Sequence, residues 1–142
     1  MSRRSRAREV VLQVLYQDDV NPGVAPDVTE RFVRARLTPG SSATPPVDLI
    51  EFALALIAGV RRNRSELDAL LAKTADNWSL ERMAATDRNV LRLGAYEILY
   101  TETPDRVAIN EAVELAKRFG IAHSAQFVNG ILDKFLEGHA KP

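Results

Sequence analysis

Hydrophobic residues recur along most of this chain at every third or fourth position, which is the spacing of one face of an α-helix. In residues 4–18 the apolar face consists of Ala7, Val10, Val11, Val14 and Leu15. In residues 124–136 it consists of Phe127, Val128, Ile131, Leu132, Phe135 and Leu136. No segment shows the alternation that is typical of a strand. The pattern therefore predicts an all-α fold of six or seven helices.

A short helix is predicted over residues 27–37. Asp27 is followed three residues later by Glu30, which resembles a capping box and predicts that the helix starts after Asp27. Residues 38–46 are rich in Pro, Gly, Ser and Thr. This composition predicts a mobile loop.

The stretch 47–75 has helical periodicity throughout. Gly59 and the polar run 61–64 lie between two apolar stripes, which predicts a kink or a break into two helices there. The arginines of that run are interpreted as a solvated face. Trp78 follows in a connector and is expected to cap the hydrophobic core.

Residues 87–100 carry apolar side chains on nearly all sides, which is typical of a central, buried helix. Thr103 and Pro104 are expected to start the next helix, because proline is tolerated in a first turn. That helix runs to Phe119, and Gly120 predicts a left-handed residue at its C-terminal end.

Three residues of the last two helices fit poorly into a simple core helix. Asn110 and Asn129 are mediocre helix formers. A buried hydrogen bond that holds two helices in register is the favoured interpretation, and direct ligand contact is the alternative. Gly130 costs about 1 kcal/mol relative to Ala inside a helix, which indicates close approach of another helix.

The composition narrows the class of protein. The 142 residues suit one domain with a hydrophobic core. The absence of cysteine excludes disulfides and thiolate chemistry. No apolar run reaches the roughly 20 residues of a membrane span, and no signal peptide is evident, so a cytoplasmic protein without membrane contact is expected. The 19 basic and 19 acidic residues balance, so binding of nucleic acid would require a local arrangement of charge.

Candidate catalytic chemistry is sparse. The sequence contains no Gly-rich phosphate loop and no HExxH motif. Glu111 and Glu114 share a helix face and could suggest acid–base or metal chemistry. Pairing with Lys117 or Arg118 on the same helix is the favoured interpretation. We therefore expect no enzyme, no catalytic residue, no metal and no cofactor.

Several segments together resemble the NusB family of bacterial transcription antitermination factors. They are RARE at 6–9 with QVLY at 13–16, LRLGAYEIL at 91–99, VAINEAVELAKRFG at 107–120 and FVNGILD at 127–133. The resemblance runs from Arg4 to Lys134. Only residues 22–46 match poorly, because they look longer and richer in proline.

The resemblance implies two small packed helical bundles that form a single RNA-binding domain over residues 1–142. It implies that the protein binds boxA RNA in nascent ribosomal transcripts together with the ribosomal protein NusE. The complex would join the elongating RNA polymerase with other Nus factors and suppress premature termination. The alternative is a non-catalytic RNA-recognition domain of a ribosomal RNA cytosine methyltransferase.

The family's RNA-facing positions correspond here to Arg4, Arg6, Arg8, Tyr16, Phe119, Gln126 and Phe127. Arginines neutralise phosphates, and exposed aromatic rings offer faces to unpaired bases. Core packing is the alternative for the three aromatic residues. The arginines are expected to be exposed, so replacing all three by Ala should weaken RNA binding and hardly change thermal stability.

The position that faces the ribosomal protein corresponds to Asp87. A simple acidic residue at a helix N-terminus is the alternative. Two departures from the family pattern concern the RNA: Gln126 stands where the family often has Lys, and His123 where it often has an acid. The first departure would weaken attraction to phosphate, and the second would remove a repulsion.

Overall fold

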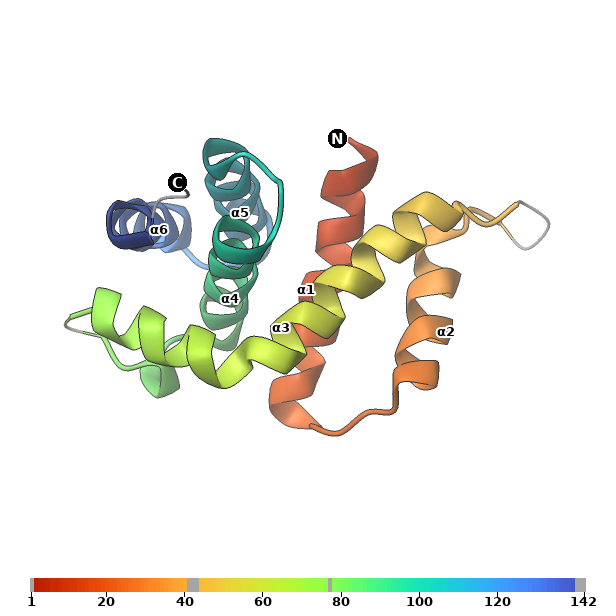
Figure 1. Ribbon diagram of the computed structural model, residues 1–142, viewed down its shortest axis with the longest axis horizontal. Helices are drawn as coiled ribbons and strands as arrows, with labels where there is room; N and C mark the ends of the chain where they lie inside the picture. The colour runs from red at the N-terminus through yellow and green to blue at the C-terminus, as the bar shows by residue number, and fades with distance from the viewer. Residues whose placement is uncertain (1, 41–43, 77, 140–142) are drawn as a thin grey trace. The chain divides into compact units, whose positions relative to one another are not determined.

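The computed structural model describes residues 2–40, 44–76 and 78–139, and these residues contain six α-helices and no strand (Figure 1). The helices are α1 (Arg3–Val20), α2 (Pro26–Leu37), α3 (Val47–Thr74), α4 (Ala85–Tyr100), α5 (Asp105–Phe119) and α6 (Ser124–His139), with one 3-10 helix, η1 (Leu80–Arg82). The predicted all-α fold is confirmed. Part of the predicted mobile loop, residues 41–43, lies outside the described residues.

The chain divides into two compact units, Met1–Gly59 and Val60–Pro142. The expectation of a single domain over residues 1–142 stays a prediction, and the two units are described one at a time. Within the described part of the chain, no helix is both long enough and apolar enough to cross a bilayer.

The first unit contains α1, α2 and the beginning of α3, and α1 packs against α2. The apolar face predicted for α1 is buried, with Val10 and Val11 fully inaccessible. The predicted capping box at the start of α2 is wrong. Ala25 is the N-cap without a side-chain hydrogen bond, and Pro26 occupies the first turn, where its missing N–H costs nothing. Asp27 instead lies 3.4 Å from Arg31 in an ion pair.

Helix α3 is continuous over 28 residues, so a break into two helices at Gly59 is wrong, and the kink that was the other possibility stays a prediction. A single glycine inside a helix costs only about 1 kcal/mol, which the long helix accommodates. Two of the three arginines of the 61–64 run, Arg61 and Arg64, are also more engaged than a solvated face would be, whereas Arg62 is exposed. Nε of Arg64 lies 4.0 Å from Asp68, and Arg61 and Asn63 make further interactions.

In the second unit, α4, α5 and α6 pack pairwise against one another. Most of α4 is buried, as predicted for a central helix. The three helices pack tightly around Gly94, where an added Cβ would lie 2.7 Å from Cδ1 of Leu132 and 3.4 Å from Cβ of Ala112. At the end of α4, the hydroxyl of Tyr100 donates to Glu66 of α3, and this hydrogen bond raises the pKa of Tyr100.

Several predictions about the last two helices are wrong. Asn110 and Asn129 are exposed, and neither amide has a hydrogen-bond partner among the described residues, so they do not lock the bundle. An added Cβ on Gly130 would meet nothing within 4 Å. Gly120 has extended backbone with φ −87°, and close contact explains this glycine, because a Cβ there would lie 2.6 Å from Ser124.

Candidate nucleic-acid interface

In the first unit, the guanidinium of Arg4 lies over the ring of Phe52, 4.4 Å from its centroid. Phe52 belongs to the first part of α3, and Arg8 also lies over this ring at 5.2 Å. Cation–π contacts of this kind contribute about 0.5–1 kcal/mol at exposed sites. They also limit the directions in which the flexible Arg4 side chain points, so Phe52 orients its charge.

The other exposed arginines of α1 are partly neutralised. Arg3 lies 3.4 Å from Asp48, and this hydrogen bond lowers the pKa of the Asp48 carboxyl. Arg6 lies 3.1 Å from the buried carboxylate of Glu9. Arg4 has no acidic partner in the described part of the unit. Among the arginines of α1, its positive charge is therefore the one most available to a phosphate.

The expectation that Arg8 is exposed is wrong, because only 3% of the residue is accessible. Helical geometry accounts for this, since Arg8 lies three residues before Val11 on the buried side of α1. Tyr16, in contrast, is 43% exposed. Its ring is therefore accessible to a ligand, which argues against complete packing in the core.

In the second unit, three predicted site residues lie on either side of the turn between α5 and α6. Phe119 ends α5 and is 44% exposed, with the guanidinium of Arg118 5.4 Å from its ring centroid. Gln126 and Phe127 lie in the first turn of α6, where Gln126 is exposed and Phe127 is half-buried. The structure brings these three residues to one end of the α5–α6 pair.

The turn itself has a defined geometry. The backbone N–H of Ile121 donates to Oγ of Ser124 at 3.0 Å, which fixes the entry into α6. His123 has a positive φ of 76°, a left-handed conformation that is uncommon for residues other than glycine and in which histidine is enriched. Ile121 is 75% exposed. The turn therefore presents an apolar and an imidazole side chain outward.

A pocket of about 550 Å³ lies beside this turn, facing η1 and the start of α4. It is lined by Trp78, Arg82, Met83, Ala84, Asp87, Ile121, Ala122, His123, Ser124 and Phe127. Phe127 and Asp87, which the resemblance assigns to different ligands, line the same pocket. Asp87 is in the first turn of α4 and is only 7% exposed. Its Oδ1 is buried without a hydrogen-bond partner in the described structure.

Trp78 does not cap the core as predicted, because 55% of it is exposed. Its ring meets the ring of Phe127 edge to face, with centroids 5.3 Å apart and an interplanar angle of 76°. Sequence reasoning missed Trp78 and Arg82 as pocket residues. The sequence shows only that a short connector contains an aromatic and a basic residue, and this does not predict where either side chain lies.

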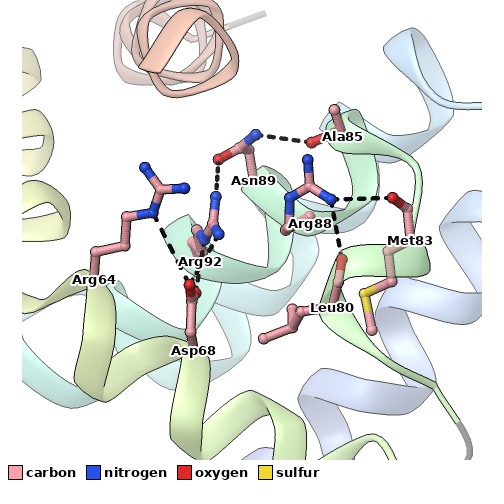
Figure 2. Close-up of polar contacts among 8 residues, drawn as sticks. All are labelled: Arg64, Asp68, Leu80, Met83, Ala85, Arg88, Asn89 and Arg92. Carbon is pink, nitrogen blue, oxygen red and sulfur yellow. Dashed lines mark hydrogen bonds and ion pairs between the residues drawn. The ribbon is translucent and has the colours of Figure 1, made fainter. Parts of the chain in front are cut away.

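Figure 2 shows how Arg88 anchors the η1 wall of the pocket. Its Nη1 donates to the carbonyl oxygens of Leu80 at 3.0 Å and Met83 at 3.2 Å. Leu80 begins η1, a one-turn helix of three residues, and Met83 is the C-cap that follows it; a helix this short has little internal hydrogen bonding of its own. Arg88 therefore holds η1 against α4.

A second network ties α4 to α3 next to this anchor (Figure 2). Arg92, which is 4% exposed, donates to both carboxylate oxygens of Asp68 at 2.7 and 2.9 Å. It also donates to Oδ1 of Asn89 at 2.9 Å, and Asn89 donates in turn to the carbonyl of Ala85 at 2.8 Å. Bidentate pairs of this kind fix direction as well as distance. The start of α4 is consequently well fixed within its unit.

The carboxylates considered for catalysis are placed as paired surface groups. Lys117 lies 3.3 Å from Glu114 on the exposed side of α5, as favoured from the sequence. Among the residues that the structure describes, no cluster of three His, Asp or Glu side chains could hold a metal ion. The pocket presents aromatic, apolar and a few charged side chains, an arrangement that suits binding.

A comparison with protein families matches residues 5–137 to the NusB family. The chain belongs to the NusB family. The transcription antitermination protein NusB of Symbiobacterium thermophilum is 45% identical over 141 residues, which cover 97% of this chain and 91% of that protein. The NusB of Myxococcus xanthus is 41% identical over 143 residues and covers all of both chains.

Solved structures of NusB proteins agree with this assignment. NusB of T. maritima has a TM-score of 0.82 and 35% identity, covering 99% of this chain and 94% of that one. A structure of antitermination factors NusB and NusE in complex with dsRNA matches with a TM-score of 0.80 and 26% identity, over 98% of this chain and 99% of that chain. The helical architecture is therefore that of the NusB family.

Proposed function

We propose that this chain is a non-catalytic transcription antitermination factor that works in the cytoplasm. It binds boxA RNA in nascent ribosomal transcripts together with NusE, and joins the elongating RNA polymerase with other Nus factors. The observation that carries this proposal is the nearly full-length likeness to a structure of NusB and NusE in complex with dsRNA. Relatives named NusB match over 91–100% of their own length, which favours this role over that of a methyltransferase's RNA-recognition domain.

In this proposal, the RNA contacts of the first unit centre on Arg4, with Arg6 in the same turn of α1 and Tyr16 about three turns further along the helix. Arg8 is buried and stacks on the same Phe52 ring as Arg4, so its role is to hold this ring in place under Arg4 and not to contact RNA. Arginine stacked on an aromatic ring keeps a flat face and its hydrogen-bond donors in a restricted orientation.

The contacts of the second unit are Phe119, Gln126 and Phe127, which flank the α5–α6 turn. Two aromatic side chains with exposed surface and one amide suit unpaired bases, since stacking tolerates any base and an amide reads base edges. Asp87 is the proposed contact to NusE. Its buried, unpartnered oxygen favours a partner that brings a hydrogen-bond donor.

The proposal is tested by titrating labelled single-stranded boxA RNA with the full chain, alone and with purified NusE. Binding should be tighter with NusE and should fall with salt, with a log–log slope of about −0.7 for each phosphate contact. A scrambled RNA of equal length serves as the control. Binding that ignores NusE, salt and RNA sequence would contradict the proposal.

A further inference from the structure

We propose that the pocket beside η1 receives one unpaired nucleobase, which stacks on Trp78. This inference rests on the proposed RNA-binding function and adds to it a specific site and a residue that the resemblance does not assign. Every residue that lines the pocket belongs to the second unit. The site is therefore complete within that unit.

The exposure of Trp78 is the first observation. Phe127 meets the indole edge to face, so it covers at most one of the two faces of the indole ring. More than half of the residue remains accessible, at 55%. A folded protein gains most by burying such a large apolar side chain, so the fold alone does not account for a tryptophan held in this way.

The pocket has the size and lining of a ligand site. Its volume of about 550 Å³ lies within the roughly 300–1,000 Å³ that is usual for small-molecule pockets. Ile121, which is 75% exposed, and the buried Met83 add apolar surface to the aromatic surface of Trp78 and Phe127. A flat, apolar ring can therefore enter and be covered by side chains from η1 and from the α5–α6 turn.

The charges at the pocket favour a nucleotide over an amino-acid side chain. Arg82 is exposed and has no ion-pair partner in the described part of the chain, and His123 is exposed as well. A nucleotide brings an anionic phosphate next to its flat ring, and so matches both Arg82 and Trp78. A cationic side chain of a protein would also stack on Trp78 and would be attracted to Asp87, the acidic residue of the lining. Asp87 is only 7% exposed, however, whereas Arg82 is exposed and would repel the cation.

The emission of Trp78 tests the inference directly, because it is the only tryptophan of the chain. Titration with single-stranded boxA RNA, without NusE, should quench this emission in parallel with binding measured by anisotropy of the labelled RNA. Trp78→Leu should weaken RNA binding about tenfold, since a base stacked on an aromatic ring is typically worth that much or more. Trp78→Phe keeps a stacking ring and should bind within about threefold of the wild type.

Tyr100→Leu is the matched control, because Tyr100 is a 44% exposed aromatic residue of the same unit outside the pocket. It should leave RNA affinity unchanged. Thermal melts of all variants separate loss of binding from loss of fold. If Trp78→Leu unfolds, quenching of the wild type still decides the question.

A series of RNAs with a single abasic position then identifies the base. Loss of the base at one position should abolish the quenching and should weaken binding by the same factor as Trp78→Leu. Trp78→Leu combined with that abasic RNA should bind no more weakly than either change alone. The inference would be overturned if RNA bound without quenching Trp78. It would also be overturned if the loss of affinity from Trp78→Leu added to the loss from the abasic position at every position of the series.

The remaining outcomes separate this inference from the proposed function. If NusE alone changes the emission of Trp78, and Trp78→Leu weakens binding of NusE and not of RNA, the pocket holds a protein side chain and the inference is wrong. If the wild type binds no boxA RNA with or without NusE, the proposed function itself fails.

Discussion

Gly94 and Gly130 both lie inside helices, but only Gly94 has a neighbouring helix against its α-carbon. An added Cβ at Gly94 would lie 2.7 Å from Leu132, a fully buried side chain, whereas at Gly130 it would meet nothing. The sequence alone could not separate them, because both interrupt an apolar helical pattern. Which glycine is needed depends on packing between helices that are distant in the chain.

We expect Gly130→Ala to raise the free energy of unfolding by about 0.5–1 kcal/mol, because it removes the entropic cost of a helical glycine without a steric clash. Gly94→Ala should lower it by about 1 kcal/mol or more, because the fully buried Leu132 would have to shift to relieve the contact with the new Cβ. Urea unfolding followed by circular dichroism measures both. A destabilised Gly130→Ala variant would contradict the helix geometry described here.

The arginines of α1 show how far single residues could be predicted. The resemblance predicted that Arg4, Arg6 and Arg8 all face the RNA. Arg8 lies three residues before Val11, and this helical spacing could have placed it on the buried face. The pairing of Arg6 with Glu9 is likewise a local i, i+3 contact. The stacking of Arg4 on Phe52 joins positions 48 residues apart in sequence, so periodicity along one helix could not show it.

At the scale of elements, long periodic segments could be predicted and short ones could not. The helical segments other than α2 were predicted mainly from apolar spacing, and α2 was predicted from a capping box that the structure does not contain. The three residues of η1 are too few to show any period. The unbroken α3 was missed because a glycine and a polar run resemble a boundary. The pocket depends on η1, so it could not be predicted either.

Because Arg88 holds η1, we expect Arg88→Met to lower the free energy of unfolding by about 1–2 kcal/mol. The carbonyl of Met83 loses the Arg88 donor, and the carbonyl of Leu80 keeps only the hydrogen bond from the N–H of Met83. The emission of Trp78, two residues before η1, should change as this wall loosens. Arg62→Met is the control, because Arg62 is an exposed arginine of the same unit without a hydrogen bond or ion pair to another described residue. Equal effects of the two substitutions on stability and emission would argue against the anchoring role.

For the whole molecule, the formal net charge is zero, so attraction to RNA depends on which charges remain unpaired. Arg3 and Arg6 are paired with acids, whereas Arg4 in the first unit and Arg82 in the second have no acidic partner in the described structure. The family and its fold were accessible from local segments of sequence. The distribution of unpaired charge was not, since it depends on ion pairs formed in the folded chain.

The expectation for replacing Arg4, Arg6 and Arg8 together by Ala therefore becomes separate expectations for Arg4 and for Arg8. Arg4→Ala should weaken RNA binding and reduce the log–log salt slope by about 0.7, the contribution of one phosphate contact on a single strand. Its effect on the free energy of unfolding should stay within about 1 kcal/mol, the usual value of an exposed cation–π contact. Arg4→Lys should keep the salt slope and still lose affinity, because lysine lacks the flat guanidinium.

Arg8→Ala should behave in the opposite way. It removes a buried side chain that stacks on Phe52 and makes a further interaction, so the free energy of unfolding should fall by about 1–3 kcal/mol. The salt slope should remain that of the wild type, because Arg8 is too buried to contact a phosphate. Thermal melts and RNA titrations at several salt concentrations check both variants. If Arg8→Ala instead keeps the stability of the wild type and its log–log salt slope falls by about 0.7, Arg8 must become exposed when RNA binds.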